Sequence, residues 1–354
     1  MANKIGNFQR ILVIKLQHHG DMLLITPVIS TLKYHYPEAE IDILLYQETQ
    51  PMLENSPDIS RIFAIDRTWK KLGAKSRLSY EYQLLKKLRK RHYDLVLNLA
   101  DQWRSAFITL FTGAPIRLGF DYPKRQNWKW YLCYTKVINT AQHHAMHTVE
   151  QNLSILNPLN LSSFMINVKM NYSEKDLTWV KEILSQHSIS QKYIVIQPTS
   201  RWFFKCWDEK KMAEIIISLK NDGKQVILTS GPDEQEITMI NNILSYCPNK
   251  NIISLAGQLT LPKLAALIDH AQLLIGVDSV PIHMAAALGT PCIALFGPSK
   301  LTLWRPWQAI GEVIWAGNYG RLPDPDDIDT DTNKRYLDLI PTEAVISSAR
   351  RLLL

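Results

Sequence analysis

Short runs of apolar, often β-branched residues alternate with segments of helical periodicity along most of this chain. The first run covers residues 11–16 and ends near a Gly-Asp turn. Runs of this kind are typical of parallel strands that are buried on both faces. Parallel neighbours need a crossover connection, so strands that alternate with helices form βαβ units. The alternation therefore predicts an α/β fold with doubly wound sheets.

The alternation occurs in two blocks, with a weaker pattern between residues 123 and 171. In the first block we expect strands at 11–16, 40–45, 61–65 and 94–99 and helices at 22–35 and 80–92. In the second we expect strands at 193–197, 225–229, 251–255, 273–277 and 291–296 and helices at 208–221, 233–246, 261–270, 280–288 and 342–354. The length also suits two domains. We expect domains at 1–172 and 173–341, with helix 342–354 as a candidate to pack back on the first.

Charge is unevenly distributed between the two blocks. Residues 1–150 contain 21 Lys and Arg against 13 Asp and Glu, whereas residues 151–354 contain 19 against 20. A basic first domain concentrates anionic partners, such as nucleic acid, an anionic membrane surface or a phosphorylated substrate. A solvated basic face explains the excess about equally well.

Cysteine usage and the N-terminal residues bear on the compartment. The apolar run at 11–16 is too short for the core of a signal peptide, and no window approaches the roughly 18 apolar residues that span a bilayer. Scattered cysteines without a CxxC pair argue against a disulfide framework and suit a reducing compartment. The four are Cys133, Cys206, Cys247 and Cys292. We expect a cytoplasmic protein whose basic face can contact a membrane surface.

The strongest local signal lies at residues 273–296, where a strand, a turn, a helix and a second strand follow one another. Asp278 and Ser279 form the turn, and the helix begins at Val280. Backbone N–H groups and the helix dipole at such a start attract anions. Ser279 also suits an N-cap and Pro281 a first turn, so simple capping explains the segment equally well.

The loop after the first strand contains His18, His19, Gly20 and Asp21. Asp21 stands near the carboxyl end of a strand, where a carboxylate can serve as general base on a sugar hydroxyl. The alternative, which the residues alone favour, is that Asp21 merely caps the following helix. The two histidines lack a carboxylate or cysteine partner at helical spacing, so they are weak candidates for metal ligands.

Two loops of the second block also carry polar side chains directly after a strand. Thr199 and Ser200 offer hydroxyl donors and Lys205 offers a cation, which together suit a diphosphate. The aromatic residues around Lys205 are expected to pack in the core. The loop 231–236 is acidic, and acidic residues at such a position can hold ribose hydroxyls, although they equally favour a helix N-terminus.

These motifs follow one another in an order that resembles the lipopolysaccharide heptosyltransferases, glycosyltransferase family 9, over essentially the whole chain. The start is His-His-Gly-Asp-Met-Leu-Leu, and the later motifs are Pro-Thr-Ser with Lys-Cys-Trp, Gly-Pro-Asp-Glu-Gln-Glu, and Val-Asp-Ser-Val-Pro-Ile-His-Met-Ala-Ala-Ala-Leu-Gly. The start and the Phe-Lys-Cys-Trp-Asp run are most similar to the members that add a branch heptose to the inner core. Two departures are Val280-Pro281, where many relatives carry glycine and a different residue, and the aromatic insertion at 202–204.

The resemblance implies a GT-B fold, in which two Rossmann-like domains face a central cleft. It implies an inverting direct displacement that needs neither a metal nor a cofactor. The donor would be ADP-L-glycero-D-manno-heptose and the acceptor a phosphorylated lipopolysaccharide inner core at the inner membrane surface, with no nucleic acid. Two alternatives stay open. A nucleotide-sugar epimerase of the same fold would need no acceptor, and a nucleic-acid-binding protein would lose affinity steeply with salt.

The resemblance also assigns roles to residues. Asp21 matches the general base, and Lys205 matches the lysine that neutralises the diphosphate. The other donor-side candidates are Thr199 and Ser200 as hydroxyl donors, Glu236 at the ribose with Asp233 as its rival, Leu259 at the adenine, and Asp278, Ser279 and Val280 at the diphosphate. The acceptor-side candidates are His18, His19, Gly20, Arg104 and Arg125.

Overall fold

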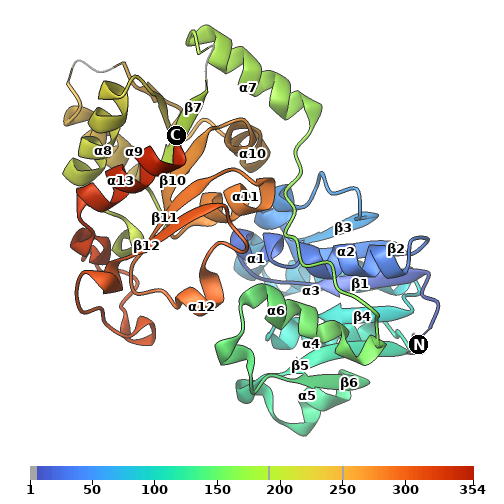
Figure 1. The fold of residues 1–354 in the computed structure, drawn as a ribbon. Helices are drawn as coiled ribbons and strands as arrows, with labels where there is room; N and C mark the ends of the chain where they lie inside the picture. Colours follow the sequence, from blue (N-terminus) through green and yellow to red (C-terminus); the bar gives the residue numbers. More distant parts are fainter. Residues whose placement is uncertain (1–5, 190–191, 249–250) are drawn as a thin grey trace. The chain divides into compact units, whose positions relative to one another are not determined.

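The computed structural model describes residues 6–189, 192–248 and 251–354 (Figure 1). The chain divides into two compact units, Met1–Lys169 and Met170–Leu354. Each unit contains one six-stranded sheet in which the paired strands are parallel. The division falls a few residues before the boundary expected from the sequence. Each unit thus has its own sheet and its own hydrophobic core.

The first sheet has the order β3-β2-β1-β4-β5-β6. Its strands are β1 (Arg10–Ile14), β2 (Glu40–Tyr46), β3 (Arg61–Ile65), β4 (Leu95–Asn98), β5 (Ile116–Asp121) and β6 (Lys136–Asn139). Its α-helices are α1 (His19–Leu23), α2 (Thr26–His35), α3 (Ala74–Arg89), α4 (Trp103–Phe111), α5 (Trp128–Leu132) and α6 (Thr148–Leu153). Strand β1 pairs with both β2 and β4, so the strand order reverses beside β1. Open α/β sheets bind ligands at such a reversal.

Two predicted elements of the first unit differ in detail. The single helix expected at 22–35 is two helices, since α1 ends at Leu23 and α2 begins at Thr26. Pro27 falls in the first turn of α2, where a missing backbone N–H is tolerated. The helix expected at 80–92 begins earlier, since α3 covers Ala74–Arg89.

The second sheet has the order β12-β11-β10-β7-β8-β9. Its strands are β7 (Tyr193–Gln197), β8 (Gln225–Leu228), β9 (Ile253–Ser254), β10 (Leu273–Val277), β11 (Cys292–Phe296) and β12 (Gly311–Trp315). Its α-helices are α7 (Glu174–Gln186), α8 (Glu209–Asn221), α9 (Glu234–Ser245), α10 (Leu261–Asp269), α11 (Val280–Leu288), α12 (Leu301–Trp304) and α13 (Thr342–Leu352). Helices α7, α10 and α11 pack together, and α8, α9 and α13 form the other helical layer (Figure 1). The order reverses between β7 and β10, so the loops after these two strands emerge side by side.

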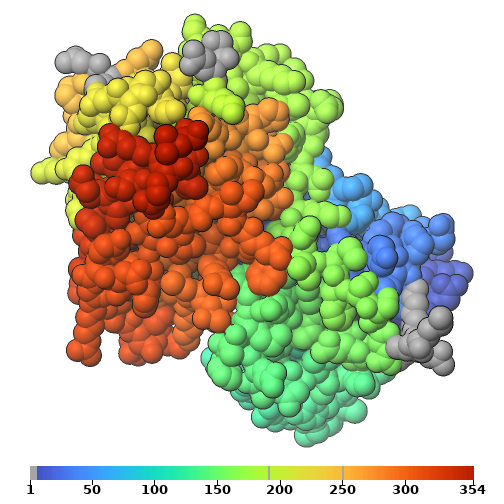
Figure 2. Space-filling view, in the orientation of Figure 1, coloured from blue at the N-terminus to red at the C-terminus, as the bar shows by residue number. Residues whose placement is uncertain are grey.

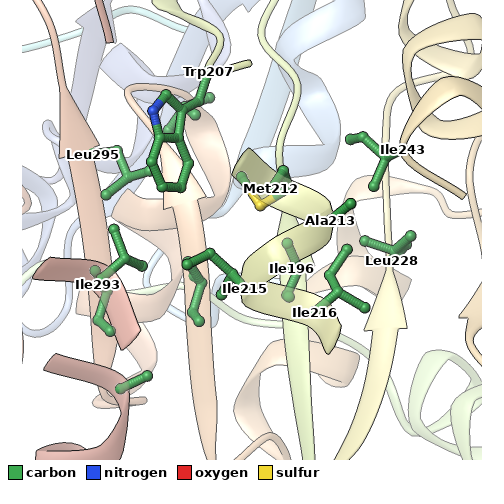
Figure 3. Packing of buried hydrophobic residues seen from close by; sticks show 14 of the residues in the cluster. Ile196, Trp207, Met212, Ala213, Ile215, Ile216, Leu228, Ile243, Ile293 and Leu295 are labelled. Carbon is green, nitrogen blue, oxygen red and sulfur yellow. The ribbon is translucent and has the colours of Figure 1, made fainter. Parts of the chain in front are cut away.

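The core of the second unit forms where α8 packs on the sheet (Figure 3). Met212, Ile215 and Ile216 of α8 are fully buried together with the sheet residues Ile196 and Leu228. Full burial of each large aliphatic side chain contributes about 1.5–3 kcal/mol relative to an exposed one. This packing fixes β7 and β8, and therefore the loops that follow them.

The C-terminal helix α13 belongs to the second unit. Val345 and Ala349 on its inner face are part of that unit's core. Arg350 Nε also donates to Asp222 Oδ2 at 2.9 Å, just beyond the end of α8. Figure 2 shows the red helix against the yellow segment that contains α8. The expectation that this helix packs back on the first domain is therefore corrected, because its apolar face completes the core of the second.

A buried carboxylate in β2 ties this strand to the end of α3. Asp42 is fully buried, and Arg91 Nε donates to its Oδ2 at 2.7 Å. The hydroxyl of Tyr93 donates to the same oxygen at 2.8 Å. Burial, and next the charge of Asp42, raise the pKa of Tyr93, so its hydroxyl stays protonated and can donate.

Removal of this hydroxyl tests how much the buried network stabilises the first unit. The Tyr93→Phe variant should lower the free energy of unfolding by about 1–3 kcal/mol, because one donor to a buried charge is lost. Urea unfolding monitored by circular dichroism measures the change. Tyr82→Phe, at an exposed position of α3, is the matched control and should change little. A Tyr93→Phe variant as stable as the control would contradict the assigned role.

Within the described ranges, no helix combines the length and the apolar character that crossing a bilayer requires.

Candidate active site

Lys205 and Asp278 form an ion pair at the carboxyl end of the second sheet. Lys205 Nζ donates to Asp278 Oδ2 at 2.6 Å, and the hydroxyl of Ser299 donates to the same oxygen. Asp278 directly follows β10, whereas Lys205 ends a short 3₁₀ helix, η6 (Phe203–Lys205), after β7. Because β7 and β10 are neighbours, the sheet order brings these distant residues together.

The lysine is also held by aromatic residues of its own loop. The ring centroid of Trp202 lies 5.1 Å from Lys205 Nζ, and that of Phe204 lies 6.0 Å away. Phe204 is buried, as expected for the aromatic residues of this loop, and Trp202 is half-buried. The ammonium group is thus positioned both by a carboxylate and by ring faces, which attract cations.

The start of α11 follows the same carboxylate. Ser279 occupies the N-cap position and Pro281 the first turn, as the sequence indicated. The Ser279 hydroxyl, however, donates to the carbonyl of Val277 at 3.2 Å. Among the described residues, no side chain at the N-cap accepts a hydrogen bond from the first backbone N–H groups of α11. Capping alone therefore does not explain why Asp278 and Ser279 stand here. The first backbone N–H of the helix is that of Val280.

Glu236 is held at the same end of the sheet by a chain of hydrogen bonds. Thr229 Oγ1 donates to Gln197 Oε1 at 2.7 Å, and Gln197 Nε2 donates to Thr199 Oγ1 at 2.8 Å. Thr199 Oγ1 in turn donates to Glu236 Oε2 at 2.5 Å. The N–H of Gly231 donates to the same oxygen at 2.9 Å. The candidate ribose-binding carboxylate is therefore fixed by the candidate hydroxyl donor.

Glycine at position 231 leaves room for this close approach of the Glu236 carboxylate. A Cβ there would lie 2.9 Å from Glu236 Oε1, closer than real Cβ contacts. The rival Asp233 is used differently, because its carboxylate accepts from the N–H of Gln235 at 2.9 Å and caps α9. The geometry therefore favours Glu236 over Asp233. Leu259, half-buried, lies just before α10.

Ser200 is buried next to Thr199, and its carbonyl accepts from the Cys206 thiol at 3.8 Å. The second unit thus places its candidates in two groups, one around Asp278 and one around Glu236. The loop after β7 contributes to both groups, through Lys205 and through Thr199. This loop is therefore the link between the two.

In the first unit, Asp21 lies in the first turns of α1, next to Gly20. Its Oδ2 accepts from the N–H of His18 at 3.2 Å, so the capping interpretation is correct for one oxygen. The other oxygen, Oδ1, lies 4.0 Å from Lys15 Nζ. The carboxylate is therefore oriented by a backbone amide on one side and faces a buried ammonium group on the other.

Lys15 is a functional candidate that the sequence interpretation missed. It is buried directly after β1, and its Nζ donates to Asn152 Oδ1 at 3.4 Å. Burial lowers the pKa of Lys15, whereas the charges of Asp21 and Asp101 oppose that change. A buried lysine is rare without a partner. The signal was present in the sequence, since Lys15 interrupts an apolar run.

The acceptor-side candidates have different partners. Arg125 Nε donates to the carbonyl of Asp101 at 2.6 Å, which places it beside the residues around Asp21. Arg104 pairs instead with Glu81 of α3, at 2.6 Å. His19 Nε2 bonds a backbone carbonyl after β2 at 2.8 Å, and burial lowers the pKa of this histidine. Arg125 is thus the arginine that the fold brings toward Asp21.

Within the part of the chain that the structure describes, no three His, Cys, Asp or Glu side chains are grouped so that they could hold a metal ion. The four cysteines are buried free thiols.

The chain is similar to known proteins, and these similarities indicate its protein family. Residues 81–334 match the model of glycosyltransferase family 9 (heptosyltransferase). Lipopolysaccharide heptosyltransferase 3 of Escherichia coli K12 is 42% identical, covering 96% of each chain. The glycosyl transferase family 9 structure from Veillonella parvula has a TM-score of 0.85 at 23% identity, covering 99% of each chain. E. coli ADP-heptose lps heptosyltransferase II has a TM-score of 0.77 at 23% identity, covering 98% of each chain.

Two doubly wound parallel sheets, with polar side chains gathered where each strand order reverses, define the GT-B fold. The chain belongs to glycosyltransferase family 9, the heptosyltransferases.

Proposed function

We propose that this enzyme transfers heptose from ADP-L-glycero-D-manno-heptose to a heptose of the phosphorylated lipopolysaccharide inner core. The observation that carries the proposal is the 42% identity to lipopolysaccharide heptosyltransferase 3 over 96% of both chains. The reaction takes place in the cytoplasm, with the enzyme bound peripherally to the inner membrane. Membership of a glycosyltransferase family leaves the epimerase alternative without support.

The donor site of this proposal lies on the second unit. The diphosphate meets Lys205, the hydroxyls of Thr199 and Ser200, and the start of α11 at Ser279 and Val280. Negative charge develops on ADP as the glycosidic bond breaks, and a fixed ammonium group stabilises that charge. Asp278 holds Lys205 at 2.6 Å, which supports this role because little rearrangement is then required.

The nucleoside end of the donor is assigned to the group around Glu236. The Glu236 carboxylate accepts hydrogen bonds from the ribose hydroxyls, and Leu259 packs against adenine. Thr199 and Gly231 already orient Glu236, which supports a preformed ribose site. ADP is recognised over other nucleotides at this end of the donor.

The acceptor side of the proposal is built around Asp21. Its carboxylate removes the proton of the attacking hydroxyl, which approaches the anomeric carbon from the face opposite ADP. A single displacement inverts that carbon, so no carboxylate nucleophile is needed. Lys15 holds the Asp21 side chain in place. Arg125 and Arg104, with the loop of His18, His19 and Gly20, receive the phosphorylated core.

The proposal is tested with purified enzyme, ADP-heptose and delipidated inner core that lacks the branch heptose. Mass spectrometry should show the addition of one heptose, and nuclear magnetic resonance should show an inverted anomeric centre. UDP-sugars should give no product. Incubation of ADP-heptose without acceptor should leave its sugar configuration unchanged. Epimerised sugar in that control, or no transfer to the core, would contradict the proposal.

A further inference from the structure

Helix α4 of the first unit exposes a row of apolar side chains. Phe107 and Phe111 are 47% and 53% exposed, and Leu110 lies between them at 38%. Leu110 and Phe111 stand three and four residues after Phe107, so they lie on the same side of the helix as Phe107. The opposite face is buried through Ser105, Ala106 and other small or aliphatic residues. The exposed apolar row is therefore separate from the face of α4 that packs in the core.

Helix α5 presents a second apolar row beside the first. Trp128 is 66% exposed and Leu132 is 60% exposed, one turn apart. The two helices are packed together, since the Trp103 ring of α4 lies 5.5 Å from the fully buried Trp130 of α5. Trp103 also stacks on Phe107 at 5.7 Å, which links the exposed row of α4 to this contact. We call these exposed residues the α4–α5 face.

The surroundings of the α4–α5 face are strongly basic. Residues 103–136 contain six Lys and Arg against one acidic residue, Asp121. Lys124, Lys129 and Lys136 are exposed, and none of them forms an ion pair within the described ranges. The Asp121 carboxylate accepts from the Tyr131 hydroxyl at 3.0 Å. Arg104 is neutralised by Glu81, but the apolar rows also lie near these three exposed lysines.

We propose that the α4–α5 face binds an anionic bilayer surface. Aromatic and aliphatic side chains enter the boundary between head groups and acyl chains, while lysines keep their ammonium groups at the head groups. Charge complementarity selects this occupant over a second copy of the chain, since two copies would bring like charges together. The inference rests on the proposed function, which places the acceptor in a membrane.

Binding to vesicles tests the face directly. The enzyme should sediment with vesicles of phosphatidylethanolamine and phosphatidylglycerol, less at high salt, and only weakly with phosphatidylcholine vesicles. The Trp128→Ser/Leu132→Ser and Phe107→Ser/Phe111→Ser variants should each bind about tenfold or more weakly to the anionic vesicles. Tyr34→Ser/Ile310→Ser, at exposed positions elsewhere, is the matched control and should bind as wild type does.

The inference is overturned if wild-type binding ignores lipid charge, if the α4–α5 variants retain binding, or if no binding occurs. Gel filtration tests the alternative that a second copy of the chain covers the face. If the wild type is a dimer and the α4–α5 variants are monomers, the face is a dimer interface. Unchanged circular dichroism of the variants shows that a loss of binding is not a loss of fold.

Activity assays separate this inference from the proposed function. On delipidated core the α4–α5 variants should keep the wild-type kcat/KM, and on core lipid embedded in anionic vesicles they should lose about tenfold or more. If wild-type enzyme transfers no heptose to delipidated core, the proposed function fails, whereas the sedimentation result still decides the membrane face. Equal activity of all variants on embedded core would reject the face alone.

Discussion

The Asp21→Asn variant is expected to lose about 10²–10⁴-fold in kcat, the usual contribution of a positioned general base. Asparagine has nearly the same shape, and its amide oxygen can still accept the N–H of His18 that Asp21 accepts at 3.2 Å. The start of α1 should therefore stay intact. Lys15 loses one charged neighbour but keeps Asn152 and the nearby Asp101. The loss should thus concern proton removal rather than folding.

Single-turnover kinetics with ADP-heptose and delipidated core measures this effect without a contribution from product release. Titration calorimetry should show unchanged ADP-heptose affinity, because Asp21 belongs to the acceptor side. Asp66→Asn replaces a half-buried carboxylate of the same unit that likewise accepts a backbone N–H, from Thr68 at 2.7 Å, and serves as the control. An Asp21→Asn variant that turns over near the wild-type rate would exclude Asp21 as the base and leave it only the capping role.

The predictability of the fold varied with how strongly each strand is buried. Strands β1, β4 and β10 are buried along their length, and apolar runs indicated all three. Strand β6 escaped prediction because Lys136–Asn139 contains only two apolar residues, and its residues are at most half-buried. Helix α13 was predicted, but its amphipathic pattern does not indicate which of the two domain cores its apolar face packs against.

The candidate site was predictable only in part, for a similar reason. Motif order identified Lys205, Asp278 and Glu236 one by one, each after a strand. Their pairing depends on which strands are neighbours, and the hydrogen bond from Lys205 to Asp278 exists because β7 lies beside β10. The contacts between Thr199 and Glu236 likewise need β7 beside β8. Sequence periodicity shows where strands lie, but it does not give their lateral order.

The pairing of Lys205 with Asp278 leads to the second large expected effect. The Lys205→Met variant should bind ADP-heptose about 30- to 4,000-fold more weakly, corresponding to roughly 2–5 kcal/mol for truncating one partner of a buried charge pair. Part of the loss is direct, because an ammonium group no longer meets the diphosphate. The rest arises because the buried Asp278 carboxylate is left without its cation and repels the phosphates.

A double-mutant cycle with Asp278→Asn separates these two contributions. Neutralising Asp278 removes the repulsion, so Lys205→Met/Asp278→Asn should recover part of the affinity that Lys205→Met loses. It should still bind ADP-heptose about tenfold or more weakly than Asp278→Asn alone, since the direct contact to the diphosphate is missing. Calorimetry at constant ionic strength measures all four affinities, with Lys210→Met as an exposed-lysine control. Equal affinities of the double variant and Asp278→Asn would mean that Lys205 only compensates a buried carboxylate and does not touch the donor.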